Sequence, residues 1–159
     1  MSAKRLGEIL MGKKLITLKQ LEEALSEQQS GRKELMLGKI LVRKGLITED
    51  DLMNALSEQC GISYVSLKGE YIDWNLCHKH IQAVAAEKKF FPFKETQNSV
   101  WVALSNPLDV AAMAQFEDHV RPKTIKLILV KEEELIELIS KCEKEKLSGL
   151  KSLLEKEDE

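Results

Sequence analysis

The sequence predicts an α+β protein in which two helix-turn-helix motifs precede a small α/β domain with a mixed sheet. The segment from Arg5 to Gln28 recurs 31 positions later as Met36 to Gln59. Fourteen of the 24 aligned positions are identical, where composition alone gives about one or two. From residue 61 onward, short alternating segments interleave with helical ones, as in a small domain of strands and helices. We therefore expect a duplicated helical subdomain at 1–60, an α/β subdomain at 61–142 and a charged C-terminal tail at 143–159.

Each copy of the repeat predicts a helix, a short turn and a second helix, with leucines and isoleucines spaced to cover one face. Thr17 and Gln20 have the spacing of a capping box at the start of the second helix, and Thr48 and Asp51 repeat it. Gly45 is placed to end the first helix of the second copy in the left-handed conformation. The leucine stripes are expected to form a core, because a helix pair must bury one face.

Three features of the repeat suggest more than packing. Gly7 and Gly38 lie inside the first helices, where glycine costs about 1 kcal/mol relative to alanine, so another backbone or a ligand is expected to approach closely. Gln28 and Gln59 end the apolar stripes with amides that both donate and accept hydrogen bonds. Arg5 carries a planar fork that could stack on a base or bind its edge. Each feature taken alone also fits a purely structural role.

The doubled pattern RLGxxLxxxxLIxxxxLxxALxxQ resembles the MshEN-type domain, which lies at the N-terminus of type II secretion and type IV pilus assembly ATPases and also occurs as a separate regulatory module. The resemblance implies that cyclic di-GMP binds across the two motifs, with ligand and protein sharing an approximate twofold axis. Leucines would contact the guanine faces, arginine and glutamine the polar edges, and backbone N–H groups the phosphates. The residues carried over are Arg5, Leu6, Gly7, Leu10, Leu21, Leu25 and Gln28 in the first copy and Leu37, Gly38, Leu41, Leu52, Leu56 and Gln59 in the second.

Two departures from the family pattern favour an alternative function. Met36 stands where the family has its opening arginine, and Lys14 stands at the turn glycine. Loss of one charge-assisted contact costs about 1.5–3 kcal/mol, and Arg32 or Arg43 are candidates for a substitute cation. The alternative is a protein-interaction module of the same fold that binds no nucleotide and docks onto a secretion or pilus machinery protein.

The second half predicts a small α/β unit, which resembles the domain that follows the paired motifs in secretion ATPases, for example in the alternating segment VWVALSNPLD. The charged tail carries leucines at 147, 150 and 154 and is expected to be a frayed helix, a linker remnant or a partner-binding helix. The expected elements are a strand at Ile62–Leu67, one or two helices at Ile72–Ala86, strands at Phe90–Phe93 and Val100–Leu104, a helix capped by Asp109 and ending near His119, a strand at Ile125–Val130 and an amphipathic helix at Lys131–Cys142.

The composition limits which binding partners and which cellular compartment we expect for the protein. The net charge of -2, with acids and lysines interspersed, predicts no binding of DNA or RNA polymers. No apolar run approaches the roughly 20 residues of a membrane span, and the N-terminus lacks the apolar segment of a signal peptide. We expect a cytoplasmic protein that reaches the inner-membrane face through a partner. Three widely spaced cysteines predict free thiols in a reducing compartment.

Catalytic and metal motifs are lacking from the sequence. Cys60 and the run from Cys77 to His80 do not have the paired spacing of zinc ligands. No GxxxxGK[ST] phosphate loop and no GxSxG, HExxH or GxGxxG motif occurs. We therefore expect no enzymatic activity, no metal and no cofactor, with cyclic di-GMP as the suspected ligand.

Overall fold

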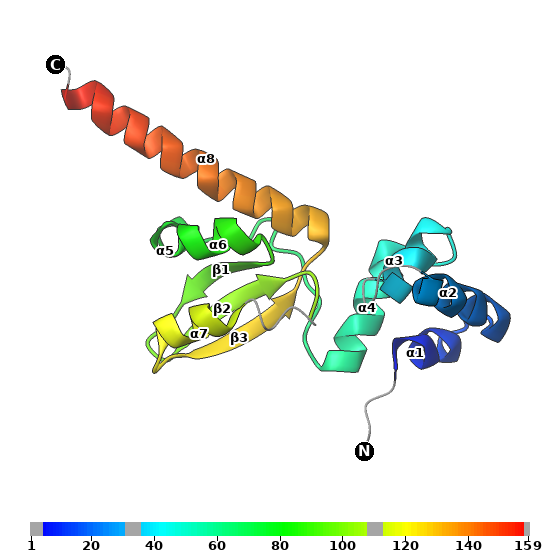
Figure 1. The fold of residues 1–159 in the computed structure, drawn as a ribbon. Coiled ribbons are helices and arrows are strands. Elements are labelled where there is room, and N and C mark those ends of the chain that lie inside the picture. The colour runs from blue at the N-terminus through cyan, green and yellow to red at the C-terminus, as the bar shows by residue number, and fades with distance from the viewer. Residues whose placement is uncertain (1–4, 31–35, 108–112, 158–159) are drawn as a thin grey trace. The chain divides into compact units, whose positions relative to one another are not determined.

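The computed structural model describes residues 5–30, 36–107 and 113–157 (Figure 1). The chain divides into two compact units, Met1–Tyr64 and Val65–Glu159. The α+β class predicted from the sequence is confirmed, with a helical first unit and a mixed sheet in the second.

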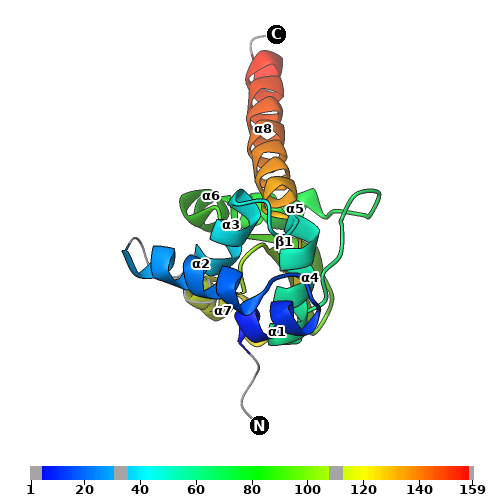
Figure 2. The same cartoon turned by 90° about the vertical axis from the view of Figure 1, so that its right-hand side faces the viewer.

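The first unit contains both predicted helix pairs. The first copy of the repeat forms α1 (Leu6–Gly12) and α2 (Leu18–Ser30), and the second forms α3 (Met36–Arg43) and α4 (Glu49–Cys60). Across the copies, α1 packs against α4 and α2 packs against α3 (Figure 2). Leucines, isoleucines and alanines of all four helices and their turns form one core.

Both predicted capping boxes are present. Gln20 N–H donates to Thr17 Oγ1 at 3.2 Å, and Thr17 N–H donates to Gln20 Oε1 at 2.9 Å. In the second copy, Asp51 N–H donates to Thr48 Oγ1 at 3.0 Å and Thr48 N–H donates to Asp51 Oδ2 at 2.9 Å. These bonds satisfy N–H groups that a helix start leaves without an intrahelical partner, so the sequence itself fixes where α2 and α4 begin.

The first helix of each copy ends in the same turn. Lys14 N–H bonds to Met11 O and Leu15 N–H bonds to Leu10 O, and equivalent bonds join Gly45 to Val42 and Leu46 to Leu41. This pair of bonds is the Schellman arrangement, which needs a left-handed residue just beyond the helix. Gly45 supplies it at φ +76°, as predicted, and the lysine at position 14 adopts it at φ +61°.

The second unit is built on a three-stranded mixed sheet. β1 (Phe90–Glu95) pairs antiparallel with β2 (Ser99–Leu104), and β2 pairs parallel with β3 (Thr124–Leu129). Helices α5 (Trp74–Lys79), α6 (Ile81–Glu87) and α8 (Glu132–Glu157) contact β1, whereas α7 (Ala114–Val120) contacts β3 (Figure 1). The fully buried phenylalanines, valines and leucines of the strands fill the core between these layers.

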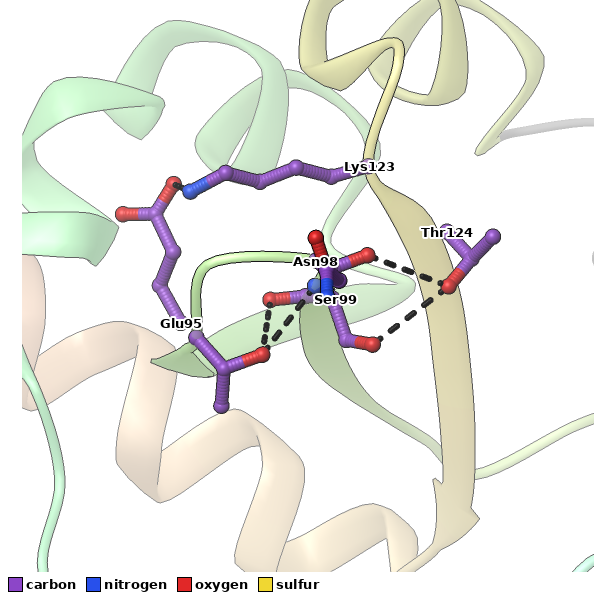
Figure 3. Close-up of polar contacts among 6 residues, drawn as sticks. Glu95, Asn98, Ser99, Lys123 and Thr124 are labelled. Carbon is purple, nitrogen blue, oxygen red and sulfur yellow. Dashed lines mark hydrogen bonds and ion pairs between the residues drawn. The ribbon is translucent and has the colours of Figure 1, made fainter.

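Contacts at the tip of the β1–β2 hairpin fix the start of β3 (Figure 3). The carbonyl oxygen of Asn98 accepts from Thr124 N–H at 3.0 Å and from Thr124 Oγ1 at 3.3 Å. Lys123 Nζ lies 2.6 Å from Glu95 Oε1. These contacts tie the parallel strand to a hairpin more than twenty residues earlier in the chain.

The strand predicted at Ile62–Leu67 is wrong, because this segment forms a single β-bridge residue and is otherwise irregular. Its backbone groups have mixed partners: Val65 N–H donates to Leu129 O at 3.0 Å, but Leu67 N–H donates to the carboxylate of Glu134 at 2.6 Å. A side-chain acceptor therefore replaces the next ladder bond, and the ladder ends there.

The helices of the second unit also differ from the prediction in their limits. The segment predicted as one or two helices at Ile72–Ala86 forms two, α5 from Trp74 and α6 to Glu87, which join at His80. The predicted cap Asp109 lies outside the described residues. The last helix does not end at Cys142 and continues through the expected tail to Glu157. No helix in the described parts of the chain is long and apolar enough to cross a membrane.

Two of the three cysteines are bonded to each other. Cys77 in α5 and Cys142 in α8 form a disulfide with their Cα atoms 6.6 Å apart, whereas Cys60 is free and exposed. The prediction of free thiols is therefore wrong for two positions. They are 65 residues apart in sequence, and the packing of α5 on α8 brings them together.

Candidate functional site

An approximate twofold axis relates the two copies of the repeat. Lys13 Nζ of the first copy lies 3.2 Å from Glu58 Oε2 of the second. Lys44 Nζ of the second copy lies 3.0 Å from Glu27 Oε2 of the first. Each residue of one ion pair is 31 positions from its counterpart in the other, so exchanging the copies exchanges the two contacts. Exchanging the copies also turns the packing of α1 on α4 into the packing of α3 on α2, and both are present.

The two repeated glycines have the same neighbour in each copy. A Cβ atom added to Gly7 would lie 2.8 Å from Cδ1 of Leu21, and one added to Gly38 would lie closer still to Cδ1 of Leu52. Close approach was predicted at both positions. In each copy the approaching group is a leucine side chain from that copy's own second helix, rather than another backbone.

The thirteen predicted ligand residues divide by their exposure. Leu10 and Leu41 have no exposed surface, Leu21 is 8% exposed, and both glycines are buried. These five residues belong to the interior of the unit. The accessible or half-buried members are Arg5, Leu6, Leu25, Gln28, Leu37, Leu52, Leu56 and Gln59.

The cations of the unit are arranged less symmetrically than its apolar residues. Arg5 is exposed at the start of α1 and makes no side-chain cap there. The corresponding Met36 begins α3. Of the two candidate substitutes, Arg43 donates to Glu27 Oε1 at 2.9 Å, and Arg32 lies outside the described residues. A hydrogen bond from Lys44, reinforced by the charge of Arg43, lowers the pKa of Glu27 below its ordinary value.

The ion pairs across the copies are functional candidates that are not among the site residues predicted from the sequence. The signal was available, because Lys13 and Lys44 are identical at aligned positions, as are Glu27 and Glu58. Identity within each pair does not show that a lysine of one copy faces a glutamate of the other. That pairing follows from the packing of the helices.

The histidines do not assemble a metal or catalytic centre in the described part of the chain, where no group of three histidine, cysteine or acidic side chains could hold an ion. Cys77 is committed to its disulfide, and His78 Nε2 lies 3.2 Å from a backbone carbonyl oxygen. His80 packs edge-on against Phe116 at 4.8 Å between ring centroids, and burial lowers the pKa of His80. His119 is exposed and contacts a carbonyl of its own helix.

The family is decided by the second unit together with the end of α4. The model of the MshEN domain matches residues 60–149, more than half of the chain. The chain belongs to the MshEN domain family. The match begins directly after the repeat ends at Gln59, so it is independent of the doubled pattern that suggested this family from the sequence.

Solved structures share the MshEN fold over most of this chain. The structure of MshE with cdg, which denotes cyclic di-GMP, has a TM-score of 0.76 and 22% sequence identity, covering 87% of this chain and 98% of that one. The N-terminal domain of XpsE has a TM-score of 0.59 and 16% identity, with 86% and 92% covered. The shared part is larger than either unit alone, so the likeness extends to both units. No curated protein matches the chain.

Proposed function

We propose that this MshEN protein is a regulatory module that binds cyclic di-GMP. The observation that carries the proposal is the approximate twofold axis of the first unit, marked by the paired contacts Lys13–Glu58 and Lys44–Glu27. Cyclic di-GMP is itself nearly twofold symmetric, so related side chains from the two copies would meet related halves of the ligand. The neighbour MshE, solved with this nucleotide, supports the proposal through the shared fold.

The accessible part of the predicted residue set would make the contacts. Leu25 and Leu56 occupy equivalent places on α2 and α4 and would pack against the guanine faces. Gln28 and Gln59 follow them by one helical turn and would bind polar edges through their amides. Arg5 would stack on one base or bind its O6 and N7 atoms. The buried Leu10 and Leu41 would support this surface from the core.

The proposed site would hold one half of the ligand more tightly than the other. Arg5 serves one half, and the equivalent place in the second copy is Met36, which has no hydrogen-bond donor and no charge. A charge-assisted hydrogen bond is worth about 1.5–3 kcal/mol, or roughly ten- to a hundredfold in affinity. We therefore propose weak, asymmetric binding that Met36→Arg would strengthen by about tenfold or more.

Binding would act as a signal by favouring one arrangement of the protein. A ligand shifts a conformational equilibrium only by its difference in affinity between the two states. The partner that reads this shift would be a protein of a type II secretion or type IV pilus system, in the cytoplasm at the inner-membrane face. The ATPase motor of such a system would be a separate domain or a separate protein, since this sequence contains no phosphate loop.

Calorimetric titration with cyclic di-GMP tests the proposal. Arg5→Ala and Gln59→Ala are expected to weaken binding, and Met36→Arg to tighten it. Arg121→Ala is the matched control, because this exposed arginine lies in the second unit and pairs with Asp118. Absence of heat from both the natural protein and Met36→Arg at high micromolar ligand would overturn the proposal.

The second candidate is a docking module that binds no nucleotide, and Met36 is the observation that favours it. It predicts that a secretion or pilus partner co-purifies equally well with and without cyclic di-GMP. It also predicts that Arg5→Ala leaves that capture unchanged. A nucleotide-dependent change in capture would instead favour the regulatory module.

A further inference from the structure

A pocket of about 510 Å³ lies in the second unit between α8 and the loop that leads into α5. None of its lining residues belongs to the repeats, and the proposed nucleotide function does not use it. The residues that line it are Leu67, Lys68, Gly69, Glu70, Tyr71, Ile72, Trp74, Glu134, Glu137, Leu138 and Lys141.

A fixed carboxylate lies in the wall of this pocket. Glu134 is 8% exposed, and its Oε1 atom accepts from Leu67 N–H at 2.6 Å and from the Ser66 hydroxyl at 3.1 Å. Both bonds fall on the same oxygen. No fully buried side-chain oxygen in the described residues lacks a hydrogen-bond partner, so Oε2 is either accessible or already bonded. The carboxylate is thus held in place by one oxygen.

Aromatic rings form another part of the wall. Trp74 is half-buried and is held at its edge by Phe91, with 5.9 Å between ring centroids. Lys141 Nζ lies 5.2 Å from the centre of the Trp74 ring, so the ring already stabilises a cation from its own chain. Tyr71 also lines the pocket, with 79% of its surface exposed.

We propose that this pocket binds an arginine side chain presented by a segment of a partner protein. A guanidinium group stacks on aromatic faces and donates charge-assisted hydrogen bonds to carboxylate oxygens, so one group would use both parts of the wall. The charges agree, because the lining holds three carboxylates, Glu70, Glu134 and Glu137, against two lysines. The incoming arginine would displace the Lys141 ammonium from Trp74, and Lys141 would then extend into solvent.

The first experiment uses the full chain and a single-side-chain probe. N-acetyl-arginine amide is titrated at constant ionic strength while the indole N–H signal of Trp74 is followed by NMR. The citrulline analogue has the same shape without the charge. Saturable movement of the Trp74 signal with the arginine probe, but not with citrulline, is expected. The indole of Trp101, which does not line the pocket, should stay still. Equal responses to both probes would overturn the proposal.

Variants test whether each charge in the pocket strengthens or weakens binding of the arginine probe. Glu134→Gln keeps an Oε1 acceptor for the loop but removes the charge, and it should weaken the arginine probe by roughly tenfold. Lys141→Met keeps the stem and removes the competing cation, so it should tighten the probe. Glu133→Gln, an exposed neighbour on the same helix, is the control and should change nothing.

If Glu134→Gln fails to fold, Glu137→Gln serves as the second charge removal and is expected to weaken the probe as well. If the pocket instead selects anions through its lysines, the effects would be reversed. The glutamine variants would then strengthen binding and Lys141→Met would weaken it. Loss of affinity in Lys141→Met, or unchanged affinity in the folded glutamine variants, would overturn the proposal.

Discussion

Lys14 and Gly45 occupy equivalent turns, and the two residues meet the same backbone requirement at different cost. Both are left-handed, at φ +61° and φ +76°, a region in which any side chain crowds the backbone. We predict that Lys14→Gly raises the free energy of unfolding by about 0.5–1 kcal/mol, less than the full steric relief because glycine also adds entropy to the unfolded chain. Urea denaturation measures the change. Gly45→Lys should lower stability, and a destabilising Lys14→Gly would contradict this account.

The ion pair of Glu95 and Lys123 predicts a contribution of pH to stability. The hydrogen bond from Lys123 lowers the pKa of Glu95 in the folded protein. A carboxyl group whose folded pKa is depressed stabilises the fold above its unfolded pKa, and this contribution is lost as the pH falls through the folded value. Glu95→Gln should therefore reduce the loss of stability between neutral and acid pH in urea titrations. Lys123→Met should reduce it similarly, and an unchanged slope in both variants would argue that the contact is absent in solution.

At the scale of the helix pairs, the repeated glycines let the first helix lie close to a leucine of the second. Gly38→Ala would place a methyl group against Leu52, and overpacking of this kind costs about 1–3 kcal/mol. We predict a loss of that size in urea denaturation. Gly12→Ala is the matched control, since nothing lies within 4 Å of its added Cβ, and it should be neutral or stabilising by up to about 1 kcal/mol.

A double-mutant cycle tests whether the cost of Gly38→Ala comes from the contact with Leu52 or from alanine at this position whatever its neighbours. In the Leu52→Ala background the clash is gone, so Gly38→Ala should cost much less there than in the natural protein. Additive effects would show that Leu52 is not the neighbour that requires glycine.

The elements that the sequence predicted correctly are those set by local signals. Apolar spacing and the boxes at Thr17 and Thr48 fix helices within a few residues of chain. The failed strand at Ile62–Leu67 depends on Glu134, which is 67 positions from the N–H that it binds. No local pattern reveals such an acceptor. The helix predicted to end at Cys142 is continuous with the tail, and Gly149 lies inside α8 although glycine is unfavourable in a helix interior.

For the molecule as a whole, the internal repeat predicted the doubled helical unit and the family, but not the arrangement of the candidate site. Identical leucines in two copies do not distinguish core from surface, and Leu10 and Leu41 are fully buried while Leu25 is 37% exposed. That distinction depends on packing of one copy against the other. The sequence does not predict the disulfide for the same reason, since it joins two helices that the sheet beneath them brings together.

The division into two units predicts that the chain unfolds in more than one step. The first unit has about 60 residues, a size that buries a smaller share of its surface, and its core is formed by its own helices. The second unit is larger and carries the disulfide, and such a cross-link stabilises typically by about 2–4 kcal/mol.

Both tryptophans, Trp74 and Trp101, belong to the second unit. Helical circular dichroism should therefore begin to fall at lower urea than tryptophan fluorescence changes, because the first unit unfolds first and carries no tryptophan. Reductant should shift the fluorescence transition to lower urea and leave the early dichroism change in place. A single transition that coincides in both probes, with and without reductant, would show instead that the two units unfold as one.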